Sequence, residues 1–328
     1  MKLSNLLVVL SALALSACQT NPSKPYVADT SRSYAKNVML AGGIGGDLRD
    51  VSWQDAKKAR EKALAEGAVD SGGPSLAGAG AFGVVNYLSP PPGFSMAGAG
   101  VMGALSWMAV GSTDPSSAPH VIAWMPKSGA TSPKSAQTEF AALIAAAMEK
   151  AVKNVQLPDG YAFGDVTRTD TGPFGGKGEW TETTVAISGS RCSEPLRQCS
   201  FNITLKDPYE GFAPMGNGGY PAYAFVARGT AHDDHTGWIR QSAPVMSSDK
   251  ASAYVRSWSA ILPEAEFYVA LSRYLPDWVY IYLPGGQRVA RHTPDGAYSW
   301  LPYPVLLNKG STHYFIEPEP ATATAAAK

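Results

Sequence analysis

Residues 180–187 have the sequence Trp-Thr-Glu-Thr-Thr-Val-Ala-Ile, and residues 201–205 have the sequence Phe-Asn-Ile-Thr-Leu. Both stretches are rich in β-branched and aromatic residues and are separated by turn-forming residues, which is typical of strands. The same pattern predicts further strands at 121–124, 223–227, 237–241, 278–283, 305–307 and 313–316. Because these strands follow one another with few helices between them, we expect an α+β fold with a mixed or antiparallel sheet.

A few helices are expected to pack on this sheet. Residues 135–152 place Phe140, Ile144 and other apolar residues on one helical face. Helices are also predicted over 254–261 and 264–274, and another begins after Ser52, with Asp55 in the capping-box position. A hairpin turn is predicted where Asn308-Lys309-Gly310 separates two strands.

The charge balance limits the classes of partner. The 328 residues include 27 Lys and Arg against 27 Asp and Glu, and only 16% of the chain is charged. Because a nucleic-acid-binding domain carries a basic surface, we expect no nucleic-acid partner. We also expect no cofactor, since no motif in the chain fixes one.

The N-terminus has the features of an export signal. One positive charge, Lys2, precedes an apolar run over 6–15, which is too short to span a membrane as a helix. The following residues, Leu15-Ser16-Ala17-Cys18, resemble the lipobox of bacterial lipoproteins. That resemblance implies cleavage before Cys18, lipidation of Cys18 and, because Gln19 follows, anchoring in the outer membrane facing the periplasm. The alternative is an ordinary secretory signal that contains a cysteine.

Two cysteines remain besides Cys18. Cys192 and Cys199 lie seven positions apart, and in an oxidising compartment this spacing predicts a disulfide. Closing so short a loop stabilises a fold by roughly 2.5 kcal/mol in the chain-entropy model. The alternative is zinc binding, which would need two further ligands, and none lies beside this pair.

An apolar segment is duplicated before the predicted sheet domain. The sequence Ser-Leu-Ala-Gly-Ala-Gly-Ala-Phe-Gly at 75–83 recurs as Ser-Met-Ala-Gly-Ala-Gly-Val-Met-Gly at 95–103, and 75–111 contains no charged residue. Small residues four apart allow close contact between backbones. Three alternatives remain open: a hairpin buried in a soluble domain, a hairpin that enters a membrane or mediates oligomerisation, and a mobile Gly-rich loop.

Two groups of residues are candidates for a functional site. His232 and His235 are three positions apart beside two aspartates, a pattern that suits a metal site or acid–base catalysis, or else an exposed polar turn. Trp278, Tyr280 and Tyr282 alternate with aliphatic residues. Their aromatic face is able either to stack on a sugar or peptide ligand, or to pack beneath a helix with the hydroxyls bonded at its edge.

These observations divide the chain into six parts: a signal peptide (1–17), a flexible tether (18–37), an N-terminal helical segment (38–70), the duplicated Gly/Ala-rich hairpin (71–112), an α+β periplasmic domain (113–316) and a disordered tail (317–328). We expect a lipid-anchored envelope protein with a binding or assembly role. Its partner is another envelope protein or a second copy that contacts the 75–111 hairpin. The alternative is a periplasmic hydrolase that uses His232 or His235.

Overall fold

The computed structural model describes residues 24–44, 48–58, 119–157, 159–171, 178–189, 192, 199–227, 237–241, 264–284, 287–289, 299–301 and 304–319. The helix predicted at 254–261 and most of the 317–328 tail lie outside these residues. So do Cys18, His232, His235 and the 75–111 hairpin.

The described helices are α2 (Tyr34–Ala41), α6 (Pro133–Ala151) and α8 (Glu264–Tyr274), with 3-10 turns η3 (Lys127–Gly129), η4 (Val152–Asn154) and η6 (Met215–Asn217). The described strands are β1 (His120–Pro126), β2 (Ala162–Thr171), β3 (Trp180–Ser188), β4 (Cys199–Lys206), β5 (Tyr209–Phe212), β6 (Pro221–Phe225), β7 (Gly237–Gln241), β8 (Val279–Leu283), β9 (Gln287–Val289), β10 (Ser299–Leu301), β11 (Val305–Asn308) and β12 (Ser311–Tyr314). A further helix begins at residue 53 and is described to residue 58.

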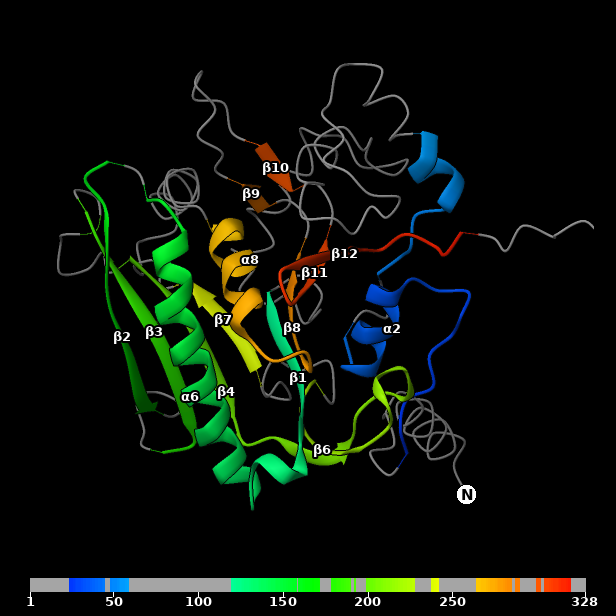
Figure 1. The fold of residues 1–328 in the computed structure, drawn as a ribbon, viewed down its shortest axis with the longest axis horizontal. Coiled ribbons are helices and arrows are strands. Elements are labelled where there is room, and N and C mark those ends of the chain that lie inside the picture. The colour runs from blue at the N-terminus through cyan, green and yellow to red at the C-terminus, as the bar shows by residue number, and fades with distance from the viewer. Residues whose placement is uncertain are drawn as a thin grey trace, which may run out of the picture.

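The main sheet has the strand order β12-β11-β8-β1-β7-β4-β3-β2 (Figure 1). Strand β1 lies at its centre and pairs with β8 along one edge. Its other edge is shared, because β7 pairs at His120 and β6 pairs from Ala123 to Pro126. Strand β5 extends the sheet beyond β6, and β9 and β10 form a separate pair. Every pairing between these described strands is antiparallel, which confirms the α+β prediction.

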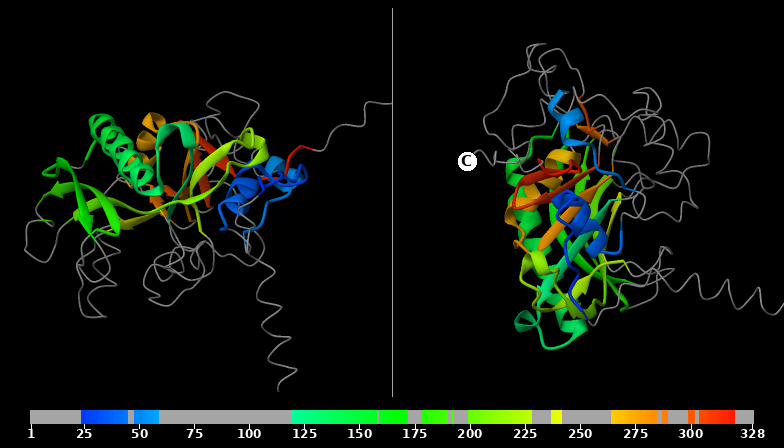
Figure 2. Two further views of the ribbon diagram at one scale, coloured as in Figure 1. Left: turned by 90° about the horizontal axis from the view of Figure 1, so that it is seen from below. Right: turned by 90° about the vertical axis from the view of Figure 1, so that its right-hand side faces the viewer.

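Helices α6 and α8 pack side by side on one face of the sheet (Figure 2). Ser132 caps α6 by accepting a hydrogen bond from the backbone N–H of Ser135, and Pro133 occupies the first turn, where its missing N–H costs nothing. The Phe140 ring lies 4.7 Å from the Phe225 ring, measured between centroids. The largest core cluster therefore lies between these helices and the sheet.

Helix α2 packs on the opposite face of the sheet. Its buried residues Ala35, Val38 and Met39 belong to a second apolar cluster that includes Trp124 and Leu306 from the sheet. On this second face, α2 thus covers the part of the sheet formed by β1, β6, β8 and β11. None of the described helices has both the length and the apolar character needed to cross a membrane.

Three local predictions can be compared with these elements. The turn between β11 and β12 has positive φ at Lys309 (53°) and Gly310 (79°), which suits a two-residue hairpin loop and confirms the turn predicted there. The cap predicted at Ser52 is confirmed, because the Asp55 N–H donates to the Ser52 hydroxyl at 3.2 Å. By contrast, α2 begins at Tyr34, inside the segment for which we predicted a flexible tether.

The strand predicted at 278–283 begins one residue later, at Val279. The Val279 N–H donates to the Pro276 carbonyl at 3.1 Å, so a turn immediately precedes the strand. The alternation of faces therefore does not extend to Trp278, whose ring centroid lies 5.3 Å from that of Phe140 on the α6 side. Tyr280 and Tyr282 lie on the other face, beside α2.

Candidate functional site

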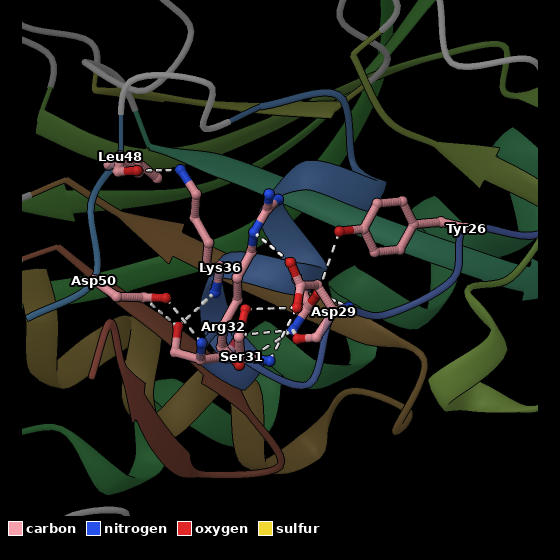
Figure 3. A network of polar contacts seen from close by, with 9 residues as sticks. Tyr26, Asp29, Ser31, Arg32, Lys36, Leu48 and Asp50 are labelled. Atoms are coloured by element: carbon pink, nitrogen blue, oxygen red, sulfur yellow. Dashed lines mark hydrogen bonds and ion pairs between the residues drawn. The ribbon is translucent and has the colours of Figure 1, made fainter. Parts of the chain in front are cut away.

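The candidate site lies where α2 meets the sheet, and polar bonds at the start of α2 fix its position. Asp50 accepts hydrogen bonds from the Ser33 backbone N–H at 2.8 Å and from the Ser33 hydroxyl at 2.5 Å (Figure 3). The Ser33 hydroxyl oxygen in turn caps α2 by accepting from the Lys36 backbone N–H. The Lys36 ammonium donates to the Leu48 carbonyl. Residues 48–50 thus hold the first turn of α2, which carries Tyr34.

A single asparagine joins α2 to the chain that precedes it. Asn37 is buried, and its amide group donates to the carbonyls of Asp29, Arg32 and Ser33 at 2.9, 3.3 and 3.0 Å. Its side-chain oxygen accepts from the Asp29 N–H at 2.8 Å and from the Tyr26 hydroxyl at 3.2 Å. Residues 26–33 are therefore part of the folded domain.

Three side chains from distant parts of the chain meet at the N-terminal end of α2. The hydroxyls of Tyr34 and Tyr280 lie 2.8 Å apart, and the Asn217 amide donates to the Tyr280 hydroxyl at 2.7 Å. The Tyr280 side chain is 2% exposed, whereas Tyr34 is 45% exposed. The hydrogen-bonded chain therefore runs from the buried sheet to a tyrosine at the surface, and we call these three residues the tyrosine–asparagine site.

A glycine turn brings Asn217 into this position. Asn217 ends η6 and is followed by Gly218 and Gly219, whose φ angles of 94° and 60° lie in the left-handed region. Residues with a Cβ rarely adopt such angles, so the Gly-Gly pair is what allows the chain to reverse here. The reversal leads directly into β6 through Tyr220, whose hydroxyl donates to the Trp124 carbonyl at 2.9 Å.

Aromatic groups surround the tyrosine–asparagine site. The His313 ring lies 4.8 Å from the Tyr34 ring, and the Trp124 ring lies 5.8 Å from the Tyr280 ring in an edge-on arrangement, measured between centroids. Burial lowers the pKa of His313 below its usual value, so its imidazole is neutral at pH 7. Burial, aided by the hydrogen bond to Tyr280, raises the pKa of Tyr34.

These properties determine what the site is able to do. The raised pKa keeps the Tyr34 phenol protonated at neutral pH, so it provides a hydrogen-bonding hydroxyl and not an anionic nucleophile or base. Burial likewise raises the pKa of Tyr220 to about 12. Within the described ranges, no cluster of three or more His, Cys, Asp or Glu residues is arranged to hold a metal ion. The chemistry suits recognition of an uncharged polar group beside an aromatic surface.

The site includes only one of the aromatic residues singled out from the sequence. Tyr280 belongs to it. Tyr282 is 1% exposed and packs edge-on against Phe315, with 6.3 Å between the ring centroids. Both tyrosines lie beneath α2, which corresponds to the packing alternative weighed for this strand, and the ring of Trp278 lies on the other side of the sheet. The residues that sequence reasoning missed are Tyr34, Asn217 and His313; of these, only Asn217 carried a signal, the turn-forming glycines that follow it.

The predicted disulfide lies at the other end of the sheet. Cys192 and Cys199 are bonded, with 5.4 Å between their Cα atoms, and Cys199 is buried in the core at the start of β4. The bond ties the segment after β3 to the first residue of the neighbouring strand, so it confirms the pairing expected from the sequence.

Comparisons with protein family models, with curated proteins and with solved structures give no match to this chain.

Proposed function

We propose that this chain is a lipid-anchored protein of the bacterial cell envelope whose role is to bind a partner. In this proposal the mature chain begins at Cys18, carries acyl chains there, and is held at the outer membrane facing the periplasm. The α+β domain is the binding part. The Gly/Ala-rich segment at 75–111 forms an apolar hairpin that contacts an envelope protein or a second copy of the chain.

The proposal rests on the roles of the three cysteines. Cys192 and Cys199 form a disulfide, and structural disulfides persist in oxidising compartments such as the periplasm. The remaining cysteine, Cys18, is the one that stands at the cleavage position of a lipobox-like sequence. An exported lipoprotein accounts for every cysteine in the chain. A protein of the reducing cytosol would explain neither the disulfide nor the lipobox-like sequence.

The tyrosine–asparagine site supports binding more than catalysis. The Tyr34 hydroxyl is protonated at neutral pH and the adjacent His313 ring is neutral, so the site offers hydrogen-bonding groups without an activated nucleophile. Such groups provide specificity in contacts with an uncharged polar surface.

Membrane fractionation of a Cys18→Ala variant tests the anchor. We expect wild-type protein in the outer-membrane fraction with acyl chains on Cys18, and the variant either unprocessed or released into the soluble periplasmic fraction. A Cys192→Ala, Cys199→Ala double variant is the matched control, since it removes the other cysteines and should stay in the membrane. A Cys18→Ala protein that is still cleaved, acylated and membrane-bound would end the proposal.

The binding role has its own test. Wild-type protein extracted in mild detergent should have a native mass that exceeds one chain, because of a co-extracted partner or a second copy. Deletion of 75–111 should return the mass to that of one chain while the downstream domain stays folded. A wild-type protein that is a plain monomer in detergent and in vesicles contradicts the assembly role.

A further inference from the structure

Exposed apolar side chains gather where the described chain begins. Val27 is 72% exposed and Met215 is 54% exposed. The Met215 N–H donates to the Tyr26 carbonyl at 2.7 Å, so these two residues belong to adjoining segments. Tyr34, 45% exposed, adjoins the same surface because its hydroxyl is linked through Tyr280 to Asn217 in η6. We call Val27, Tyr34 and Met215 the N-terminal patch.

The length of the preceding chain places this patch close to the proposed anchor. Residues 26–33 are fastened to the domain by Asn37 and by the hydrogen bond between Tyr26 and Met215. Residues 18–25 then separate Cys18 from this fastened segment. Eight residues span at most about 28 Å, whereas a tether over 18–37 would have reached about 70 Å. A lipid on Cys18 therefore holds Tyr26, which adjoins the patch, within about 28 Å of the bilayer surface.

The charges near the patch favour its contact with a lipid surface. Lys24 is exposed at the start of the described chain. Arg32 and Asp29 neutralise each other in an ion pair of 3.0 Å. An exposed lysine three positions before the exposed Val27 suits the interface of a membrane, where cations meet anionic headgroups and tyrosine prefers the boundary layer.

We propose that the N-terminal patch rests on the lipid headgroup layer of the membrane that holds Cys18, and that it fixes the orientation of the domain. This inference rests on the lipid anchor of the proposed function. Helix α6 lies at the opposite end of the sheet from α2 (Figure 1), so in this orientation it points away from the bilayer. A domain on a free tether would instead sample every orientation.

Nitroxide labelling of the full mature lipoprotein tests the orientation. Val27→Cys and Met215→Cys each add one reactive thiol, since Cys192 and Cys199 are bonded to each other. The matched control is Leu143→Cys on α6, another exposed apolar position, with 39% exposure. The acylated proteins are reconstituted in phosphatidylethanolamine–phosphatidylglycerol vesicles. Collision of each label with a water-soluble nickel relaxation agent is then compared with its value in a soluble Cys18→Ala form.

We expect nickel accessibility at positions 27 and 215 to fall at least threefold on the vesicles, while position 143 changes by less than a factor of 1.5. If nickel accessibility at all three positions changes by the same factor between the soluble form and an acylated, vesicle-bound protein, the patch is overturned but the anchor stays intact. Mass spectrometry of the Cys18 peptide separates the two failures. An unacylated Cys18 refutes the anchor and the patch together.

Discussion

Replacement of Asn37 by alanine should release the N-terminal segment from the domain without unfolding the sheet. Asn37 makes five hydrogen bonds to residues 26–33. At about 1 kcal/mol net for each bond, their sum is about 5 kcal/mol. Most of the freed groups lie in a half-exposed turn, where water replaces the lost partner, so we expect about half of that sum. Alanine favours helix by about 0.5 kcal/mol, which leaves a loss of about 2 kcal/mol.

Hydrogen exchange measures this loss directly. A local opening made easier by about 2 kcal/mol exchanges about 30-fold faster. The amides to follow are Asp29, which donates to the Asn37 side chain, and Met215, which donates to Tyr26. Amides of α6 should not change.

Asn154→Ala is the matched control. The Asn154 amide group donates to the Lys150 carbonyl at 2.8 Å and to the Tyr274 hydroxyl at 2.9 Å, at the far end of α6. This variant should leave exchange in 26–33 unaltered. If Asn37→Ala also leaves exchange at Asp29 and Met215 unchanged, residues 26–33 are not held as we describe and the short tether is refuted.

Three further predictions concern the domain itself. Phe140→Ala should lower the free energy of unfolding by about 3–5 kcal/mol in urea titration, because Phe140 is fully buried; a loss below 1 kcal/mol would contradict its central position. Replacing Cys192 and Cys199 together by alanine should lower the free energy of unfolding by about 2.5 kcal/mol in the same assay; an unchanged value would show that the disulfide does not stabilise the domain. Because burial lowers the pKa of His313, the unfolded chain binds its proton more readily; stability should fall as the pH drops below about 6.5, and His313→Gln should flatten that fall. Equal pH profiles for the two proteins would exclude this role.

The strands that the sequence predicted share a clear pattern of apolar and β-branched residues. Strand β7 has the predicted bounds, and β3 and β4 extend the predicted ranges by one to three residues. Strand β2 escaped prediction for a physical reason. It lies at the edge of the sheet and is exposed along most of its length. Its sequence therefore lacks the regular alternation of apolar and polar residues from which strands are predicted. A β-bulge between Phe163 and Val166 also breaks the alternation.

Helix α2 and the site it carries were harder to foresee. The helix has only eight residues, and its signals, a serine cap and three small or apolar buried residues, follow a polar, proline-containing stretch. The tyrosine–asparagine site depends on contacts between residues 63 and 246 positions apart. Such non-local pairing is invisible to local patterns, which is why Tyr280 was singled out for its strand but Tyr34 and Asn217 were not.

The intact mass of the protein extracted from outer membranes, without reduction, tests the central claim most directly. We expect a chain that begins at Cys18, carries the added mass of acyl chains, and lacks two hydrogens because Cys192 and Cys199 are bonded. A chain that begins at another residue with no acyl mass, or one absent from the membrane fraction, would contradict the account.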